Sequence, residues 1–229
     1  MHFLLLGATG RTGKHVVSEL LSQNHTAVAL VRNSKSLTPQ PGLTVVTGTS
    51  LSKDDIRNAL YAAPGLSPSA AIITLNAVRK SDSPFAAPVS PPRFLADSCA
   101  NACEVLEQAG IRRIVFMSTA GAGDSWNSIP WLSKAFMGWT NIKYALDDHN
   151  LVDKEIRATK MDWTLVRAVK LAFDDPNAQN EAKTDVETLP GSGVGVRVSD
   201  SVTVKSAAKF LVKVAVEGLY VKETIVVRN

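Results

Sequence analysis

Apolar residues follow two alternating patterns along the chain, which predict strands and helices in turn. Short, continuous apolar runs bounded by glycine, proline or polar residues indicate strands that are buried on both faces. Longer segments with apolar residues three and four positions apart indicate helices. The predicted strands span residues 3–6, 26–31, 43–47, 70–75, 112–118, 163–167, 194–198 and 223–227. The predicted helices span residues 14–21, 52–60, 94–109, 142–158 and 201–217.

This alternation predicts an α/β fold: a Rossmann-like, doubly wound, mainly parallel sheet with helices on both faces. Two stretches interrupt the pattern. Residues 80–92 hold four prolines, and residues 120–140 hold four large aromatic residues; we expect both stretches to be long loops. We expect residues 1–229 to form a single domain, in which residues 168–200, approximately, add a small C-terminal cap over the ligand cleft.

Composition narrows the classes of partner. No Lys/Arg-rich block indicates nucleic-acid binding, and no apolar run reaches the length of a membrane span. We therefore expect a small-molecule substrate, with neither nucleic acid nor membrane as a partner, and a monomer or homodimer. The net charge of +4 suits an anionic cofactor. Cys99 and Cys103 are expected to be packed thiols in a reducing, cytoplasmic location, and we predict no metal site.

Three glycines at a spacing of three follow the first predicted strand. Gly7 permits a sharp turn, Gly10 lets the backbone approach a pyrophosphate, and Gly13 lets the helix pack closely on the strand. The start of the following helix favours anions, because its N–H groups and its dipole point at the turn. The alternative is a tight turn without a ligand. The cofactor-binding candidates here are Gly7, Thr9, Gly10, Arg11, Thr12 and Gly13.

The residue that follows the second predicted strand indicates which dinucleotide binds. An NAD site has Asp or Glu here, whereas the 2′-phosphate of NADP needs a cation. In this chain the position is Arg32, which can hold a phosphate through two hydrogen bonds, with Ser34 as a further donor and Arg11 as a second cation. We expect NADP(H); the alternative is a solvated basic turn. At the carboxyl ends of other strands, the expected site adds Leu75, Asn76 and Met117.

Five segments carry a resemblance to a known family. They are Gly7–Gly13, Leu30–Arg32, Arg113–Ser118, Asp147–His149 and Asp162–Arg167. With these segments the chain resembles the atypical short-chain dehydrogenase/reductases, above all the NmrA-like and biliverdin-reductase-B-like NAD(P)-binding proteins, over nearly its whole length. The resemblance implies a Rossmann-like fold, NADP(H) as cofactor, and small carbonyl, quinone, flavin or natural-product substrates.

The chain departs from this family in three places. The wider superfamily uses a Tyr-x-x-x-Lys pair on the helix after the fifth strand, in which the lysine lowers the pKa of the tyrosine. Here the tyrosine of that helix is Tyr144, and Asp148 stands four residues later; an anion would raise that pKa instead. Thr49 stands where relatives often have Asp, and Ala168 where they commonly have Pro.

Three residues are candidates for proton transfer or substrate contact. Ser118 ends the fifth predicted strand, where its hydroxyl can hydrogen-bond a carbonyl; the alternative is a bond to the backbone. His149 shares an apolar helix face and is either a core residue or a proton donor or relay, which the resemblance to biliverdin-reductase-B-like proteins favours. Tyr144 is the third candidate. The aromatic residues expected either to line the substrate or to pack on the sheet edge are Trp126, Trp131, Phe136 and Trp139.

Three functions fit these features. The first is an NADPH-dependent oxidoreductase, in which hydride reaches a flat, apolar acceptor held near Ser118 and His149. The second is a non-catalytic NADP(H)-binding redox sensor of the NmrA type, which suits the missing Tyr-x-x-x-Lys pair. The third is a biosynthetic isomerase or cyclase that uses the cleft as a shaped template.

Overall fold

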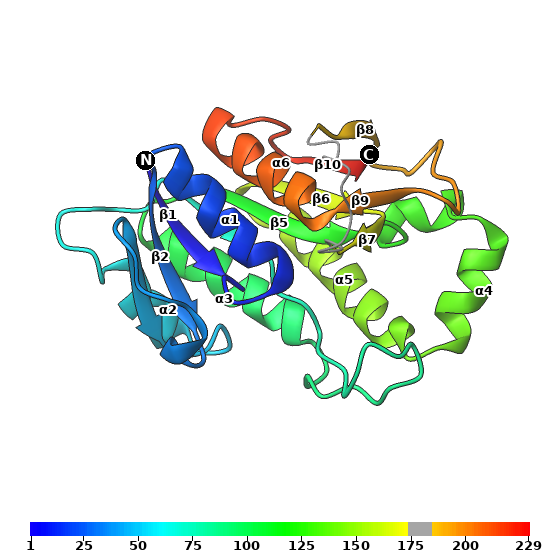
Figure 1. Cartoon of the computed structure of the whole chain (residues 1–229), viewed down its shortest axis with the longest axis horizontal. Helices are drawn as coiled ribbons and strands as arrows, with labels where there is room; N and C mark the ends of the chain where they lie inside the picture. Colours follow the sequence, from blue (N-terminus) through cyan, green and yellow to red (C-terminus); the bar gives the residue numbers. More distant parts are fainter. Residues whose placement is uncertain (174–184) are drawn as a thin grey trace.

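The chain is built around one large, mainly parallel sheet (Figure 1). A computed structural model describes residues 1–173 and 185–229. Within them the sheet has eight strands in the order β3-β2-β1-β4-β5-β6-β10-β8; the first seven run parallel, and β8 pairs antiparallel with β10. The strands are β1 (His2–Leu6), β2 (Thr26–Val31), β3 (Leu43–Thr47), β4 (Ala70–Ile73), β5 (Arg113–Thr119), β6 (Asp162–Ala168), β8 (Glu187–Pro190) and β10 (Glu223–Arg228).

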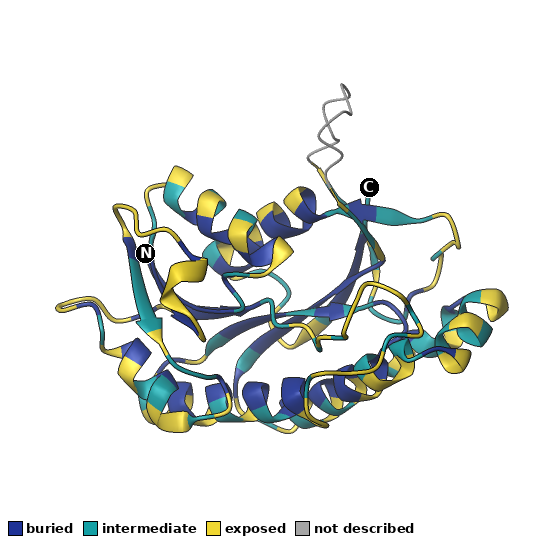
Figure 2. Ribbon diagram, turned by 60° about the horizontal axis from the view of Figure 1, so that its bottom comes forward, coloured by how far each residue is buried: buried dark blue, intermediate teal, exposed yellow. Residues whose placement is uncertain are grey.

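Helices cover both faces of this sheet, which makes a three-layer molecule (Figure 2). On β1, Phe3 and Leu5 pack into one core cluster and Leu4 and Leu6 into the other. Because both faces are covered, the strand needs apolar residues at successive positions, and this is why it appears as a continuous apolar run. One face carries α1 (Arg11–Ser22) and α6 (Val204–Glu217), and the other carries α2 (Lys53–Leu60), α3 (Phe94–Gln108) and α5 (Ile142–Arg157). The predicted fold class is therefore confirmed.

Side-chain caps determine where two of the helices begin. The hydroxyl of Ser52 accepts a hydrogen bond from the N–H of Asp55 and starts α2, as the sequence predicts. The hydroxyl of Thr203 accepts from the N–H of Ser206, so α6 starts at Val204. The prediction placed that start at residue 201. Residues 201–203, which were predicted as helix, instead form β9 (Ser201–Thr203). This strand pairs with β7 (Lys170–Ala172) in a small parallel sheet.

Two further predictions of secondary structure were wrong. Residues 194–198 form turns rather than a strand, because Gly193 and Gly195 beside them adopt φ values of +74° and +94°, which break an extended run. Residues 120–140 contain a 3₁₀ helix, η2 (Gly123–Ser128), and a helix, α4 (Trp131–Trp139). Pro130, at the N-cap position, precedes the first helical residue. The sequence did not reveal this helix because its indole and phenyl side chains are exposed and so do not mark a buried helix face.

Loops that follow β1, β4 and β5 lie at the carboxyl ends of these strands. Strand order reverses between β1 and β4, and ligands of open α/β sheets bind in the crevice at this reversal. Residues 78–89 fold back on themselves through hydrogen bonds from Val89 N to Val78 O and from Lys80 N to Ala87 O. Of the expected cap at 168–200, residues 174–184 lie outside the described residues; the described flanks lie beside the crevice.

Candidate functional site

The glycine turn brings the start of α1 against the ends of β1 and β4. Gly7 has a φ of +96°, and a Cβ atom there would lie 2.7 Å from the carbonyl carbon of Thr74. A Cβ on Gly13 would overlap the carbonyl oxygen of Gly7, whereas one on Gly10 would lie 3.2 Å from that oxygen. Gly7 and Gly13 are thus required by backbone packing, while Gly10 keeps the cradle open.

The start of α1 is built for an anion. Its N-cap is Gly10, which has no side chain to bond the free N–H groups of the first turn. That turn contains Arg11 and Lys14 and no acidic residue. Cations at a helix N-terminus oppose the helix dipole, so the turn combines unpaired N–H groups with two positive side chains. A pyrophosphate satisfies both.

A cleft of about 1380 Å³ runs from this turn along the carboxyl ends of β2, β1, β4 and β5. Ligand pockets of ordinary size are about 300–1000 Å³, so this cleft has room for a dinucleotide and a second molecule. The predicted site residues that line it are Gly7, Thr9, Gly10, Arg11, Thr12, Arg32, Leu75, Asn76, Met117, Ser118 and His149. Those that are not among the described lining residues are Gly13, Ser34 and Tyr144.

The two cations proposed for the cofactor differ in their surroundings. Arg32 is exposed at the end of β2 and lines the cleft, and no ion pair within residues 1–173 and 185–229 involves it. Arg11 pairs with both carboxylate oxygens of Asp82 at 2.6 and 2.7 Å, and its guanidinium lies 4.2 Å from the centre of the Phe173 ring. Arg32 is therefore free to bind an anion, whereas Arg11 would have to exchange Asp82 for one.

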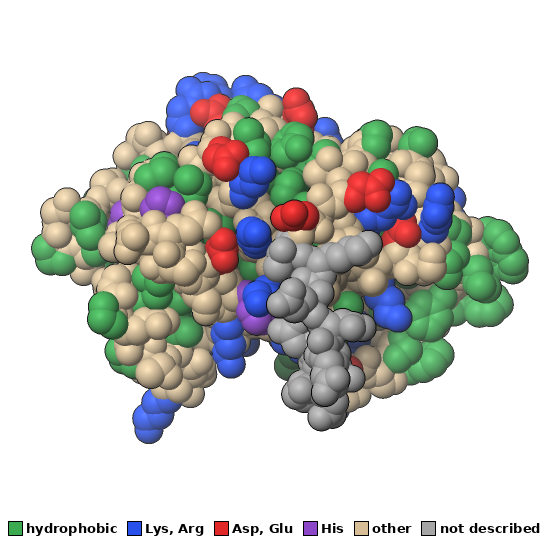
Figure 3. Space-filling model, turned by 45° about the horizontal axis from the view of Figure 1, so that its top comes forward, with side chains coloured by type: hydrophobic (Ala, Val, Ile, Leu, Met, Phe, Trp, Pro, Cys, Tyr) green, Lys and Arg blue, Asp and Glu red, His purple; other side chains and the backbone are tan. Residues whose placement is uncertain are grey.

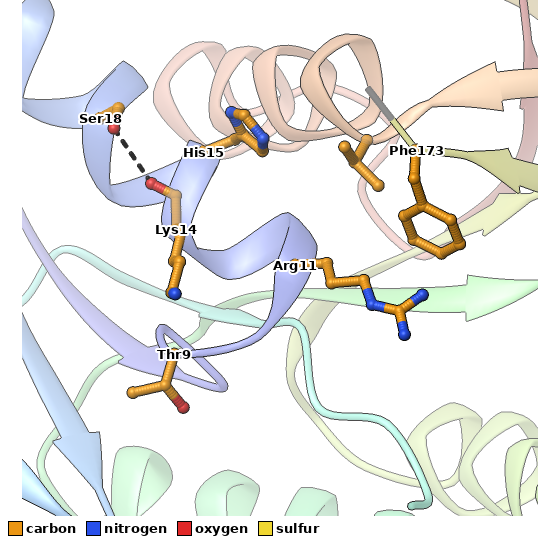
Figure 4. Close-up of a pocket in the computed structure, with 7 residues that line it drawn as sticks. Thr9, Arg11, Lys14, His15, Ser18 and Phe173 are labelled. Atoms are coloured by element: carbon orange, nitrogen blue, oxygen red, sulfur yellow. Dashed lines mark hydrogen bonds between the residues drawn. The ribbon is translucent and has the colours of Figure 1, made fainter. Parts of the chain in front are cut away.

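A smaller pocket of about 420 Å³ adjoins the outer side of the glycine turn (Figure 4). Arg11 and Phe173 approach each other at one end of it, and Lys14 extends toward Thr9 at the other. Thr9, Arg11 and Phe173 line this pocket and the large cleft alike. Arg11 therefore stands on the boundary between the cleft and solvent.

Ser118 and His149 lie together at the far end of the cleft. The Ser118 hydroxyl, at the end of β5, is 3.5 Å from Nδ1 of His149 on α5, and both residues are buried. The imidazole meets the Phe116 ring edge to face at 6.1 Å. Burial, and then the positive charge of Arg167, lower the pKa of His149 to about 4. At that pKa His149 is a neutral imidazole at pH 7, and its expected role as a proton donor or relay stays a prediction.

Tyr144 does not line the described part of the cleft. Its side chain is 50% exposed and lies under the Lys143 ammonium, 5.2 Å from the ring centre. Asp148, which replaces the lysine of the superfamily, is buried, and its carboxylate accepts hydrogen bonds from the N–H groups of Leu95 and Ala96 at 2.7 and 3.0 Å. It therefore caps α3. The expected role of Tyr144 as a proton source stays a prediction.

The aromatic residues of the 120–140 segment divide into two groups. Phe136 lines the cleft together with Leu132 and Met137. Trp126, Trp131 and Trp139 are not among the described lining residues. The expected aromatic wall is therefore formed by one aromatic side chain and aliphatic neighbours.

Arg167 on β6 joins this strand to α5, to η2 and to the residue that follows β8. Its side chain is 0% exposed and forms ion pairs with Asp153 on α5 and with Asp124 on η2, the latter at 2.6 Å. It also donates a hydrogen bond of 2.6 Å to the carbonyl of Gly191. Arg167 is the register partner of Ser118 across β5 and β6. The family resemblance marked Arg167 as a motif residue, but its partners come from distant parts of the chain.

The sequence did not point to every residue of the cleft. Arg79 lines it, and its buried Nε atom has no hydrogen-bond partner within the described structure. Gly48 and Ser50 line the adenine side, whereas Thr49 uses its N–H to bond Asp55 at 2.8 Å. The prolines around residue 84 concealed Arg79, because they made its segment appear to be an open loop.

The fold and the cleft define a dinucleotide-binding α/β protein with a crevice at the β1–β4 reversal. The chain belongs to the NAD(P)H-binding family, whose model matches residues 7–217. The expected cofactor class is therefore confirmed.

Relatives and solved structures agree with this assignment. Over 153 residues the chain is 26% identical to the photosystem II assembly factor Ycf39 of Synechocystis sp.; the match covers 64% of this chain and 43% of the relative, so the chain spans less than half of that protein. ChuY, an anaerobillin reductase from Escherichia coli O157:H7, has a similar fold, with a TM-score of 0.75 and 18% identity over 99% of this chain and 96% of that one. A short-chain dehydrogenase/reductase of Veillonella parvula in complex with NADP gives a TM-score of 0.75 and 19% identity over 100% and 94%.

Two searches of the described residues complete the description. No group of three or more His, Cys, Asp or Glu side chains there is arranged to hold a metal ion. None of the helices in those residues combines the length and the apolar character needed to cross a bilayer. Cys99 and Cys103 are free and buried on α3, as expected.

Proposed function

We propose that this protein is an NADPH-dependent oxidoreductase that reduces a small, flat and largely apolar molecule. The observation that carries the proposal is the continuity of the cleft. One end has the glycine turn and Arg32, and the other has Ser118 and His149 among apolar side chains. The volume of about 1380 Å³ exceeds the roughly 300–1000 Å³ of an ordinary ligand pocket. A substrate would therefore lie beside the nicotinamide in the same enclosure.

Preference for NADPH over NADH rests on Arg32. Its guanidinium has no ion-pair partner among the described residues and lies on the cleft at the end of β2, where a 2′-phosphate would lie. Replacing Arg32→Ala should weaken NADPH binding about 10- to 150-fold, the range for one charge-assisted hydrogen bond, and leave NADH binding nearly unchanged. Lys35→Ala, a basic residue of the same loop that does not line the described cleft, is the matched control. Titration calorimetry with both dinucleotides measures the effect; equal affinity of the unaltered protein for both would refute the preference.

Ser118 and His149 would orient the acceptor. Bound NADPH supplies a hydride. The Ser118 hydroxyl can donate a hydrogen bond to a substrate carbonyl. At the same time its oxygen can accept a hydrogen bond from the Nδ1–H of neutral His149. Because His149 is protonated in about one molecule in a thousand at pH 7 when its pKa is about 4, the proton for the product would come from solvent. Ser118→Ala should lower kcat more than NADPH affinity.

The substrate end of the cleft selects for apolar, flat molecules. The side chains that face it are mostly apolar, and they come from α4, α5 and the segment before α4. We propose that the described flanks of residues 168–200, which also line the cleft, act as the substrate cap. The apolar lining residues here are Ile129, Leu132, Phe136, Met137 and Leu146. NADPH oxidation against a panel of quinones, flavins and enones tests the activity; absence of turnover across the panel would count against an enzyme.

A second candidate function is a non-catalytic NADP(H) sensor or assembly factor. Two observations favour it: Tyr144 lies outside the cleft, and His149 is neutral. The similarity to an assembly factor from a cyanobacterium adds support. Tight NADPH binding without oxidation by any acceptor would select this function over the first.

A further inference from the structure

Helix α4 presents two different apolar faces. One face, with Leu132, Phe136 and Met137, lines the cleft. The other carries Trp131 and Trp139, which are eight residues apart and so lie on the same side of the helix. These indoles are 78% and 86% exposed and do not line the described cleft. Figure 3 shows the hydrophobic side chains gathered at the edge of the molecule where α4 lies.

A neighbouring loop extends this outer face. The main-chain N–H of Asn141 donates to the carbonyl of Pro84 at 2.8 Å, and the Asn141 side-chain amide donates to the carbonyl of Phe85 at 2.9 Å. Phe85 is thereby held beside the end of α4, and it is 69% exposed. Exposed apolar patches of this kind mark interaction sites in proteins that are otherwise soluble.

Basic residues predominate around this face: the loop of residues 78–89 carries Arg79, Lys80 and one acid, Asp82, whose carboxylate pairs with Arg11. Residues 125–146 hold five aromatic residues and two lysines, Lys134 and Lys143, and no acidic residue. The nearest carboxylates in sequence are Asp124, which pairs with buried Arg167, and Asp147 on α5. Indoles at both ends of a short helix, with lysines between and after them, match the chemistry of a membrane interface.

We propose that the outer face of α4 binds the surface of a bilayer that contains anionic lipids, with Trp131 and Trp139 inserted at the level of the headgroups. The helix is about 13 Å long, at about 1.5 Å per residue, and would lie in the plane of the membrane. This mode differs from the spanning segment that the sequence excludes. The opposite face of α4 lines the cleft, so the apolar end of the cleft would lie close to the lipid.

Charge decides between a bilayer and a second copy of the chain. If two α4 helices packed across a two-fold axis, the interface would bring together Lys134 and Lys143 of both copies, with no acid in residues 125–146 to neutralise them. An anionic lipid surface attracts both lysines. It also accepts indole and phenyl side chains without requiring a complementary protein shape.

Sedimentation with vesicles tests the proposal. Vesicles of phosphatidylcholine with about 30% phosphatidylserine should bind the protein, and pure phosphatidylcholine vesicles should bind it less well. The double variant Trp131→Ser/Trp139→Ser should weaken binding at least about tenfold. Lys134→Gln with Lys143→Gln should weaken it by roughly fivefold per lysine on the anionic vesicles alone. Tyr61→Ser, which removes a 65% exposed aromatic residue at the end of α2, is the matched control and should bind as the unaltered protein does.

Three results would overturn the proposal. The first is absence of binding to the anionic vesicles. The second is binding by the tryptophan double variant that equals binding by Tyr61→Ser. The third is a dimer in sedimentation equilibrium that the double variant converts to a monomer, which would assign the face to a second copy. Calorimetric NADPH binding and a thermal melt establish that each variant is folded, and vesicle binding is measured without any turnover.

Discussion

The buried neutral His149 should make the protein lose stability as pH falls. Its pKa is lowered to about 4 in the folded state, by burial first and then by Arg167, whereas an unfolded chain titrates at 6.5. Between these values the unfolded state binds more protons than the folded one, so the free energy of unfolding decreases as pH decreases. The stability contributed by the neutral form is complete above pH 7 and is lost progressively down to about pH 4.

The size of this effect follows from the two pKa values. From pH 7 to pH 5, a pKa of 6.5 unfolded and about 4 folded removes about 2 kcal/mol from the free energy of unfolding. By pH 4 the loss is about 3 kcal/mol. A domain of ordinary stability has about 5–15 kcal/mol in total, so the loss is readily measurable.

Urea unfolding at a series of pH values measures the slope for the unaltered protein and for His149→Gln. The variant should lose the share of the slope contributed by His149, and any constant cost of the substitution cancels in the comparison. His2 and His25 also have lowered pKa values through burial, so they leave a residual slope in both proteins. His25→Gln is the control, because that side chain is only partly enclosed.

Two results would refute this reasoning. One is the same pH slope in His149→Gln as in the unaltered protein. The other is an imidazole pKa of His149 near 6.5 in a proton NMR titration of the folded protein. Either would mean that the ring is solvated or paired with a carboxylate in the folded state, and it would restore His149 as a candidate acid.

Three further changes have expected outcomes. Arg167→Ala should lower the free energy of unfolding by about 1–3 kcal/mol, because Asp153 loses one of its two cationic partners and keeps Arg157; urea titration measures this. Gly13→Ala should prevent closure of the glycine turn, so both thermal stability and NADPH binding should fall, and an unchanged melting temperature would contradict the packing described. Asp148→Ala should cost about 1–3 kcal/mol, since two N–H groups of α3 lose their acceptor; chemical denaturation at pH 7 tests it.

Much of the cofactor site could be predicted from the sequence because its residues are local to strand ends. Gly7 and Gly10 belong to a turn whose geometry depends on a few consecutive residues, and Arg32 is placed by the strand before it. Ser34 is not among the described residues that line the cleft. It stands two residues beyond Arg32 but enters a short 3₁₀ helix, which removes it from the described lining of the cleft.

The catalytic end was harder to predict because its residues meet across the chain. The sequence predicted that Ser118 and His149 lie in the same part of the site, but it did not predict the contact between their side chains. The replacement of a lysine by Asp148 became intelligible when the structure placed that carboxylate on the first turn of α3. The helix in residues 131–139 escaped prediction because its exposed indoles obscured the periodicity on which helix prediction depends.

By itself, the sequence determined the alternation of strands and helices, the continuous burial of the parallel strands, and the glycine turn, because each follows from the order of neighbouring residues. Only the tertiary structure decided which charges are free and which are paired. Within the described residues Arg32 has no ion-pair partner, Arg11 is held by Asp82 from 71 positions away, and burial, followed by the charge of Arg167, keeps His149 neutral at pH 7. The physical reason is that burial and Coulomb interaction depend on distance in space, which local patterns do not encode.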